Sequence, residues 1–206
     1  MLYRRIIQRL FYHFYRELAW SYDAVAWLVS AGLWQRWALV AVPKLRGRTL
    51  ELGFGPGYVQ LALADGAGCA GLDASPQMVR RAAQRLRRVG HWPRLVRGVA
   101  QQLPFAAASF DSVVATFPAE YILDAQTHHE IRRVLVPGGR VVIIPSAELA
   151  PGAYRHLVDL AYALTLMSAR ASADGPSTSF ALGDLHLQAT WVSLGPSRVM
   201  VLEGEI

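Results

Sequence analysis

An acidic residue followed by three evenly spaced glycines is the segment best suited to chemistry, Glu51-Leu52-Gly53-Phe54-Gly55-Pro56-Gly57. Glycine lacks a Cβ atom, so the backbone there can adopt positive φ and let a ligand approach closely. A helix that begins next, at about Tyr58, would present the positive end of its dipole to that ligand. These residues therefore indicate a nucleotide-binding turn between a strand and a helix.

Two classes of nucleotide could bind at such a turn. NAD-type dinucleotides are bound by the pattern G-x-G-x-x-G, whereas residues 53–57 have the spacing G-x-G-x-G. S-adenosylmethionine (SAM) carries an ammonium and a carboxylate in place of a pyrophosphate, so Glu51 at the strand end would be useful for its methionine part. Asp73 ends the next predicted strand and could accept hydrogen bonds from the ribose of either nucleotide. The glycine spacing and Glu51 favour SAM and disfavour an NAD-dependent oxidoreductase.

A metal site is not expected. Neighbouring helical residues point about 100° apart, so His128 and His129 cannot easily share one ion. We predict instead that residues 128–130 lie on the surface of a helix. The single cysteine, Cys69, excludes a disulfide within the chain and argues against a thiolate site.

The elements that must position these residues alternate along the chain. Strands are expected at residues 48–52, 69–72, 94–96, 112–116, 140–144, 187–194 and 198–203. Helices are expected at residues 58–64, 76–89, 125–134 and 154–169. Such alternation favours a mainly parallel sheet covered on both faces. The last two strands are separated only by residues 195–197, which predicts an antiparallel hairpin, and the weakly patterned residues 170–186 are expected to form a mobile loop.

Four groups of motifs, in this order, resemble the class I SAM-dependent methyltransferases, in the branch that includes ubiquinone/menaquinone and small-molecule methyltransferases. They are ELGFGPG at 51–57, GLDASPQM at 71–78, LPF with SFD at 103–105 and 109–111, and EIRRVLVPGG at 130–139. The resemblance runs from about Tyr22 to Ile144. It leads us to predict a Rossmann-like, doubly wound α/β sheet of seven strands, mostly parallel with a C-terminal antiparallel hairpin. We expect residues 44–206 to form the SAM-binding domain and residues 1–43 an N-terminal helical lid.

The resemblance also implies which residues bind the cofactor, SAM. The methionine part would be held by Glu51, Gly53, Gly55 and Gly57, the ribose by Asp73, and the adenine would lie beside Ala74 and Met78.

The adenine edge departs from the family pattern. Relatives often carry an acidic residue two places after Arg97, where this chain has Val99. We expect the backbone at Ala100 or the side chain of Gln101 to take the place of that carboxylate. Thr116, at the end of the fourth strand, completes the predicted cofactor site.

Three residues are candidates for catalysis, Tyr22, Glu120 and Tyr121. Ligands of open α/β sheets bind beyond the carboxyl ends of the strands, so residues 116–121 should border the site of methyl transfer. Tyr22 resembles a tyrosine that lies over the cofactor in quinone-type relatives. Both tyrosines could equally serve as aromatic core or rim, and Glu120 is more simply explained as a solvated or helix-capping acid. None of the three is a compelling base, which weakly favours an acceptor that is already nucleophilic, or loss of its proton to solvent.

The charge of the chain bears on its partners. The formal net charge is +6, and seven arginines lie within residues 80–97. A solvated helix face explains them, and attraction to an anionic partner is the alternative. No aromatic residue interleaves with this run before Trp92, so nucleic acid is not expected as a partner.

The N-terminal segment, residues 1–43, combines four of the six tryptophans with Arg4, Arg5, Arg9 and Arg16. Such a segment could be a lid over the sheet or a surface that meets lipid. The chain lacks a signal-peptide pattern, so we expect the protein in the cytoplasm, either free or peripheral to the inner face of the membrane. In-line methyl transfer to a small-molecule or lipid, quinone-like acceptor is the function implied by the resemblance. A non-catalytic protein of the same fold, which binds SAM or a partner, is the second hypothesis.

Overall fold

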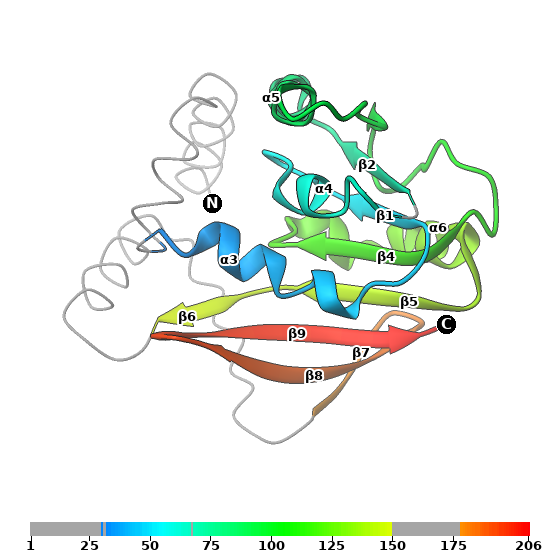
Figure 1. The fold of residues 1–206 in the computed structure, drawn as a ribbon. Coiled ribbons are helices and arrows are strands. Elements are labelled where there is room, and N and C mark those ends of the chain that lie inside the picture. The colour runs from blue at the N-terminus through cyan, green and yellow to red at the C-terminus, as the bar shows by residue number, and fades with distance from the viewer. Residues whose placement is uncertain (1–29, 31, 67, 150–177) are drawn as a thin grey trace, which may run out of the picture.

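The computed structural model describes residues 30, 32–66, 68–149 and 178–206 of the 206-residue chain. Within them, one twisted sheet is covered by helices on both faces, with α3 and α4 on one side and α6 on the other (Figure 1). The strands are β1 (Thr49–Leu52), β2 (Cys69–Asp73), β3 (Leu95–Arg97), β4 (Phe110–Thr116), β5 (Leu135–Ile144), β6 (Ala147–Leu149), β7 (Thr178–Leu182), β8 (Leu185–Leu194) and β9 (Ser197–Glu205). The α-helices are α3 (Trp34–Leu39), α4 (Tyr58–Ala62), α5 (Pro76–Arg88) and α6 (Ala125–Val134), and η1 (Val42–Lys44) and η2 (Glu120–Leu123) are short 3-10 helices.

The order of the strands places the candidate site. It runs β3-β2-β1-β4-β5-β9-β8-β7, and β6 pairs with β9. Strands β1 to β5 are parallel, whereas β9 is antiparallel to both β5 and β8. Strand β1 lies between β2 and β4, where the chain order reverses, and ligands of such sheets bind at this point, beyond the carboxyl ends of the strands.

The predicted Rossmann-like sheet with a C-terminal hairpin is confirmed, but the predicted number of strands is wrong. The sheet has nine strands instead of seven. The two additional strands are β6 and β7, which have no counterpart among the predicted strands. Strand β7 forms a hairpin with β8 through residues 183–184, so this part of residues 170–186 is sheet and not a mobile loop. The helix predicted at residues 154–169 and the first part of the predicted lid, residues 1–29, lie outside the described residues.

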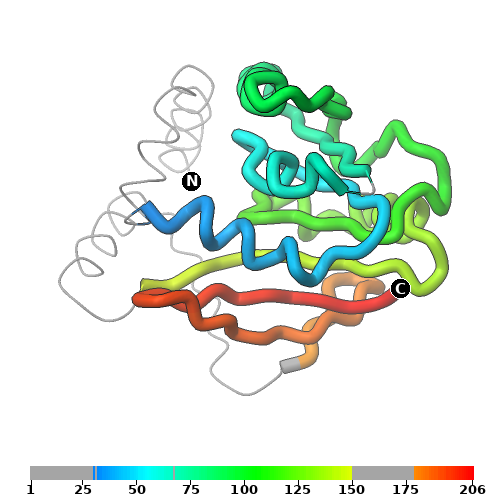
Figure 2. The backbone as a smooth tube through the Cα atoms, in the orientation of Figure 1, coloured from blue at the N-terminus to red at the C-terminus, as the bar shows by residue number. Residues whose placement is uncertain are grey.

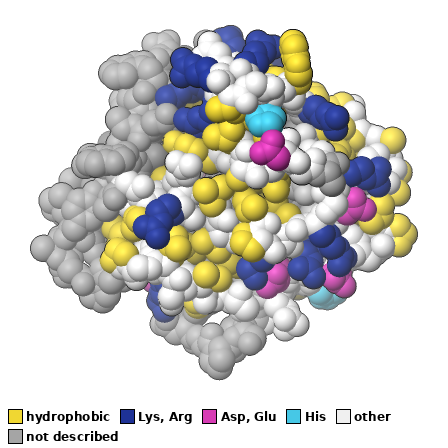
Figure 3. Space-filling model, in the orientation of Figure 1, with side chains coloured by type: hydrophobic (Ala, Val, Ile, Leu, Met, Phe, Trp, Pro, Cys, Tyr) yellow, Lys and Arg dark blue, Asp and Glu magenta, His cyan; other side chains and the backbone are white. Residues whose placement is uncertain are grey.

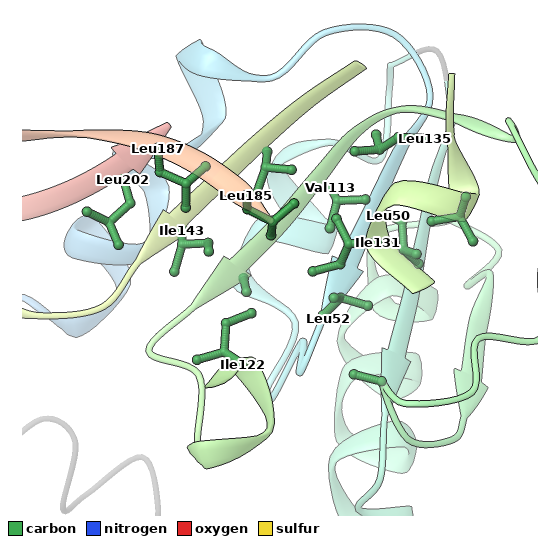
Figure 4. Close-up of a cluster of buried hydrophobic side chains, with 14 of the residues drawn as sticks. Leu50, Leu52, Val113, Ile122, Ile131, Leu135, Ile143, Leu185, Leu187 and Leu202 are labelled. Carbon is green, nitrogen blue, oxygen red and sulfur yellow. The ribbon is translucent and has the colours of Figure 1, made fainter. Parts of the chain in front are cut away.

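Alternation along the strands divides the core into two layers. In β4, Val113 and Ala115 face α6, and Val114 faces α3 and α4, because successive side chains of a strand point to opposite faces. The layer under α6 is the larger, and Figure 4 shows Leu50, Ile131 and Leu185 meeting there from β1, α6 and β8. Both faces of the central strands are therefore buried, as their near-continuous apolar runs require.

Helix α3 and η1 cross the other face of the sheet in one pass, which the backbone trace in Figure 2 makes visible. Trp37, Ala38 and Ala41 are buried there against β4, β5 and β9. The indole nitrogen of Trp37 donates a hydrogen bond to Ser197 Oγ at 2.9 Å. This pass carries Trp34 to the carboxyl end of β4, beside the candidate site.

Helix α5 begins at a well-formed cap. Ser75 Oγ accepts a hydrogen bond from the Met78 amide, and Pro76 occupies the first helical position. The helix buries Met78, Ala82 and Leu86 and exposes Arg80, Arg87 and Arg88, as expected of a solvated face. Figure 3 shows Lys and Arg side chains gathered at the top of the molecule, over this helix.

Candidate functional site

The glycine turn joins β1 to α4 and has positive φ at Gly53 (67°), Gly55 (51°) and Gly57 (82°). A Cβ atom on Gly53 would lie 2.6 Å from the hydroxyl oxygen of Tyr121, and one on Gly57 would lie 2.8 Å from Ala82 Cβ. A Cβ atom on Gly55 would meet nothing within 4 Å. The first and third glycines are therefore required by packing as well as by φ, whereas the middle one borders open space in which a ligand could lie.

Glu51 lies on β1, two residues before the glycine turn. Its side chain is only 1% exposed, yet it lines a small cavity together with Gly53, Gly55 and Thr116. Gln60 Nε2 donates a hydrogen bond to Glu51 Oε2 at 2.9 Å. Burial raises the pKa of Glu51 to about 8, the hydrogen bond from Gln60 lowers it, and the charge of Asp73 raises it. The site thus holds a carboxyl group that a cationic ligand would help to ionise.

Asp73 ties the glycine turn to the start of α5. Its Oδ2 accepts a hydrogen bond from the Gly55 amide at 2.9 Å, and its Oδ1 accepts one from the Ser75 amide at 2.8 Å. Burial raises the pKa of this carboxyl above its ordinary value. Each carboxylate oxygen has a second lone pair, so Asp73 can still accept hydrogen bonds from ribose hydroxyls. Of the two predicted adenine contacts, Ala74 is exposed, and Met78 is buried against Phe54.

The predicted adenine edge lies where β3 leads toward β4. Val99 is 51% exposed, and Ala100 is buried. Gln101 Nε2 donates a hydrogen bond to Asp124 Oδ2 at 3.1 Å, which holds the amide in one orientation. The Gln101 carbonyl oxygen is the acceptor of this amide and is the atom that could accept a hydrogen bond from an adenine amino group.

An ion pair on α6, between the buried Glu130 and the half-buried Arg133, holds the segment that follows. Glu130 accepts hydrogen bonds from the Leu103 amide and from Arg133, each at 2.7 Å. Arg133 also donates to the carbonyl oxygens of Leu103 and Phe105, at 2.9 and 2.7 Å. These contacts join the motifs at 103–105 and 130–139 physically, a link that is not evident from the sequence.

The prediction that residues 128–130 form a helix surface is wrong for two of them. His129 is exposed, but His128 and Glu130 are buried. His128 Nε2 lies 2.7 Å from the carbonyl oxygen of Ile122, so its imidazole belongs to the packing between η2 and α6. Across the described ranges, no group of three or more His, Cys, Asp or Glu side chains could hold a metal ion.

An aromatic wall borders the cavity at the carboxyl end of β4. The Phe117 ring lies 4.3 Å from that of Trp34, centroid to centroid, and Trp34 itself lines the cavity with Glu51. Phe117 has φ 49°, a left-handed conformation that is costly for a residue with a side chain. A role for Trp34 does not follow from the sequence, in which the signal is the concentration of tryptophans in the N-terminal segment.

The candidate catalytic residues differ in their surroundings. The Tyr121 hydroxyl donates a hydrogen bond to the Leu52 carbonyl oxygen at 3.0 Å, and burial raises its pKa above the ordinary value. Tyr121 therefore remains protonated and supports the end of β1. Glu120 is exposed on η2, and Tyr22 lies outside the described residues. The structure brings Glu51, the glycines, Asp73, Tyr121 and Thr116 to one end of the sheet.

Comparison with known proteins places this site in a family. A family model described as a methyltransferase domain matches residues 50–143. A ubiquinone/menaquinone biosynthesis C-methyltransferase of Syntrophotalea carbinolica is 33% identical over 151 residues, which cover 68% of this chain and 64% of the relative. A demethylmenaquinone methyltransferase of Thermus thermophilus is also 33% identical, over 68% of this chain and 67% of the relative. The crystal structure of a SAM dependent methyltransferase from Aquifex aeolicus shares the fold, with a TM-score of 0.52 and 15% identity over 84% of this chain and 92% of that one.

The fold and the site define a nucleotide-binding protein of the Rossmann-like methyltransferase class. The chain belongs to the class I SAM-dependent methyltransferases, in their quinone branch, and the resemblance inferred from the motifs is confirmed. The cofactor of this family of enzymes is SAM, and the buried carboxyl of Glu51 and the open space beside Gly55 fit its methionine part. The chain spans 64% of the length of the Syntrophotalea carbinolica relative. Within the described part of the chain, no helix has the length and apolar character needed to cross a membrane.

Proposed function

We propose that this protein transfers a methyl group from SAM to a small-molecule or lipid acceptor of the quinone type. The observation that carries the proposal is the cavity in which the buried Glu51 carboxyl and the ring of Trp34 line the same space at the carboxyl end of the sheet. A carboxyl group suits the cofactor's ammonium, and an aromatic ring suits a flat, apolar acceptor. The relatives described above are named as quinone methyltransferases, which supports the same class of acceptor.

Positioning is the main task of the residues in this proposal. The bound cofactor supplies a methyl group already activated on a sulfonium. Glu51 would hold the ammonium, Asp73 the ribose and Gln101 the adenine amino group. Trp34 and Phe117 would orient the acceptor and exclude water from it, which favours in-line displacement.

The site offers little for proton removal. Glu120 is exposed, and the Tyr121 hydroxyl is engaged with the Leu52 carbonyl oxygen. This arrangement supports an acceptor whose proton leaves to solvent or which is already nucleophilic. The catalytic roles considered for Tyr22, Glu120 and Tyr121 stay predictions.

Calorimetry and a transfer assay test the proposal. We expect S-adenosylhomocysteine to bind the full chain, and SAM labelled in its methyl group to transfer label to a short-chain demethylmenaquinone. Trp34→Leu should raise the KM for the acceptor severalfold and leave the Kd for S-adenosylhomocysteine nearly unchanged. Family membership disfavours the non-catalytic alternative. It would be supported if the protein did not bind the cofactor at millimolar concentration, or if it bound the cofactor but transferred no label to the quinone.

We further propose that the N-terminal segment, residues 1–43, serves the acceptor side, as a lid or as a peripheral contact with the inner face of the membrane. Its tryptophans and arginines support this, since aromatic and cationic side chains together favour the interface of an anionic bilayer. The proposal places the protein in the cytoplasm and assigns it no nucleic-acid partner.

A further inference from the structure

Gln60 is a buried polar residue on α4 for which the proposed function has no use. Its side chain is 3% exposed and reaches both β1 and β2. Its Nε2 donates hydrogen bonds to Glu51 Oε2 at 2.9 Å and to the Ala70 carbonyl oxygen at 3.3 Å. Two acceptors on two strands therefore fix the amide group, and with it one oxygen of Glu51.

The carboxyl of Glu51 borders the space that a ligand would take. Its side chain is almost fully buried, and it lines the cavity beside Gly55 and Thr116. The backbone amide of Gln60 adds a second favourable hydrogen bond to this carboxyl. A buried carboxyl that is held by α4 and faces a cavity is placed to meet a hydrogen-bond donor of the ligand.

Among the described residues, the groups that face Glu51 include no cation. Asp73 on β2 raises the pKa of Glu51, so it opposes ionisation of that carboxyl. The Tyr121 hydroxyl on η2 and the half-buried Cys69 thiol also face it, and because burial and the charge of Glu51 raise the pKa of both, they stay neutral. In this part of the chain Gln60 supplies the favourable hydrogen bonds, and a cation that enters the cavity would be the counter-charge.

We propose that Gln60 positions Glu51 so that this carboxyl gives up its proton when the cofactor's ammonium arrives, which couples cofactor binding to proton release. The inference rests on the proposed function and adds a positioning residue to it. In the empty site, burial holds the pKa of Glu51 at about 8, so the group is mostly protonated at neutral pH. The ammonium then supplies the counter-charge, and Gln60 stabilises the anion from the opposite side.

The consequence is an affinity that depends on pH. Below the pKa of a group that must ionise, each pH unit weakens binding about tenfold. The affinity for S-adenosylhomocysteine should therefore rise about tenfold from pH 6 to pH 7 and level off above about pH 8. Close to one proton should be released for each ligand bound at neutral pH.

Calorimetry with S-adenosylhomocysteine in buffers of different ionisation enthalpy measures this proton directly. Gln60→Met keeps the volume of the side chain and removes the hydrogen bond to the anion. We expect Gln60→Met to weaken binding about tenfold at pH 7, to shift the plateau to higher pH, and to approach the wild type at high pH. Gln188→Met, the same change at an exposed position of β8, is the matched control and should alter neither the proton count nor the profile.

The outcomes separate this inference from the proposed function. Absence of any S-adenosylhomocysteine binding overturns the proposed function and, with it, the coupling. Binding by the wild type without proton release overturns the coupling alone, and needs no variant. An unchanged pH profile in a folded Gln60→Met overturns the role of Gln60. A titration of the apo protein labelled with carbon-13 in glutamate adds a readout free of ligand, in which Gln60→Met must raise the midpoint of the Glu51 resonance.

Discussion

At the scale of single residues, Glu51 makes the stability of the empty protein depend on pH. Its pKa is raised from 4.5 to about 8 on folding, so the native state holds a proton that the unfolded chain has lost between those values. Stability is therefore greatest below about pH 4.5, as far as this group is concerned, and is lost as the pH rises toward 8. We expect Glu51→Gln to remove this decline and to have the higher Tm of the two at pH 8. Thermal unfolding followed by circular dichroism tests this; curves that fall in parallel for both proteins would contradict it, and Glu120→Gln serves as an exposed control.

Val99 gives a second prediction at the same scale. The family resemblance leads us to expect an acidic residue here that would bind the adenine amino group, and Val99 is 51% exposed, so a new carboxylate would be tolerated. Val99→Asp should tighten the binding of S-adenosylhomocysteine about threefold to tenfold, as one exposed charge-assisted hydrogen bond would. Val89→Asp introduces the same charge at a position that is 54% exposed on the end of α5. Equal effects of the two substitutions in calorimetry would show that the adenine lies elsewhere.

At the scale of elements, α6 organises the loop that leads into β4. Arg133 neutralises the buried Glu130 and donates to two carbonyl oxygens of residues 103–105, and it holds the pKa of Glu130 below its ordinary value. Arg133→Met would remove the guanidinium donor from both carbonyls and leave the carboxylate with the Leu103 amide as its donor. We expect a loss of about 1–3 kcal/mol in the free energy of unfolding, measured by urea denaturation. Arg132→Met, an adjacent exposed arginine on the same helix, should cost much less, and similar losses for both would refute the proposed role of the ion pair.

At the scale of the whole molecule, the distribution of charge predicts a preference for anionic membranes. The full chain should sediment with vesicles rich in phosphatidylglycerol and not with neutral ones, and salt should weaken the binding. Removing residues 1–20 should reduce this binding strongly. Arg87→Gln with Arg88→Gln lowers the net charge on the exposed end of α5 instead, and should have a small effect. Deletion without effect, or no vesicle binding at all, would argue for a lid in place of a membrane contact.

What the sequence by itself determined was local. The glycine turn, Glu51 before it and Asp73 at the next strand end could be read because each depends on residues close together in the chain. The alternation of strands and helices between residues 48 and 144 could be read for the same reason, since periodicity is a local property.

Only the tertiary structure decided which distant residues meet. Strand β6 pairs with β9, which lies about fifty residues later in the sequence. Trp34 packs on Phe117, which lies about eighty residues later in the sequence. The burial of Glu130 depends on the loop at 103–105 folding back over α6. In the sequence, nothing distinguishes Gln60 from other helical residues. The packing of α4 on the sheet places its side chain against Glu51. Such contacts arise from the packing of whole elements, so the spacing of motifs locates the cofactor site, whereas the protonation of its carboxyl is set only in the folded protein.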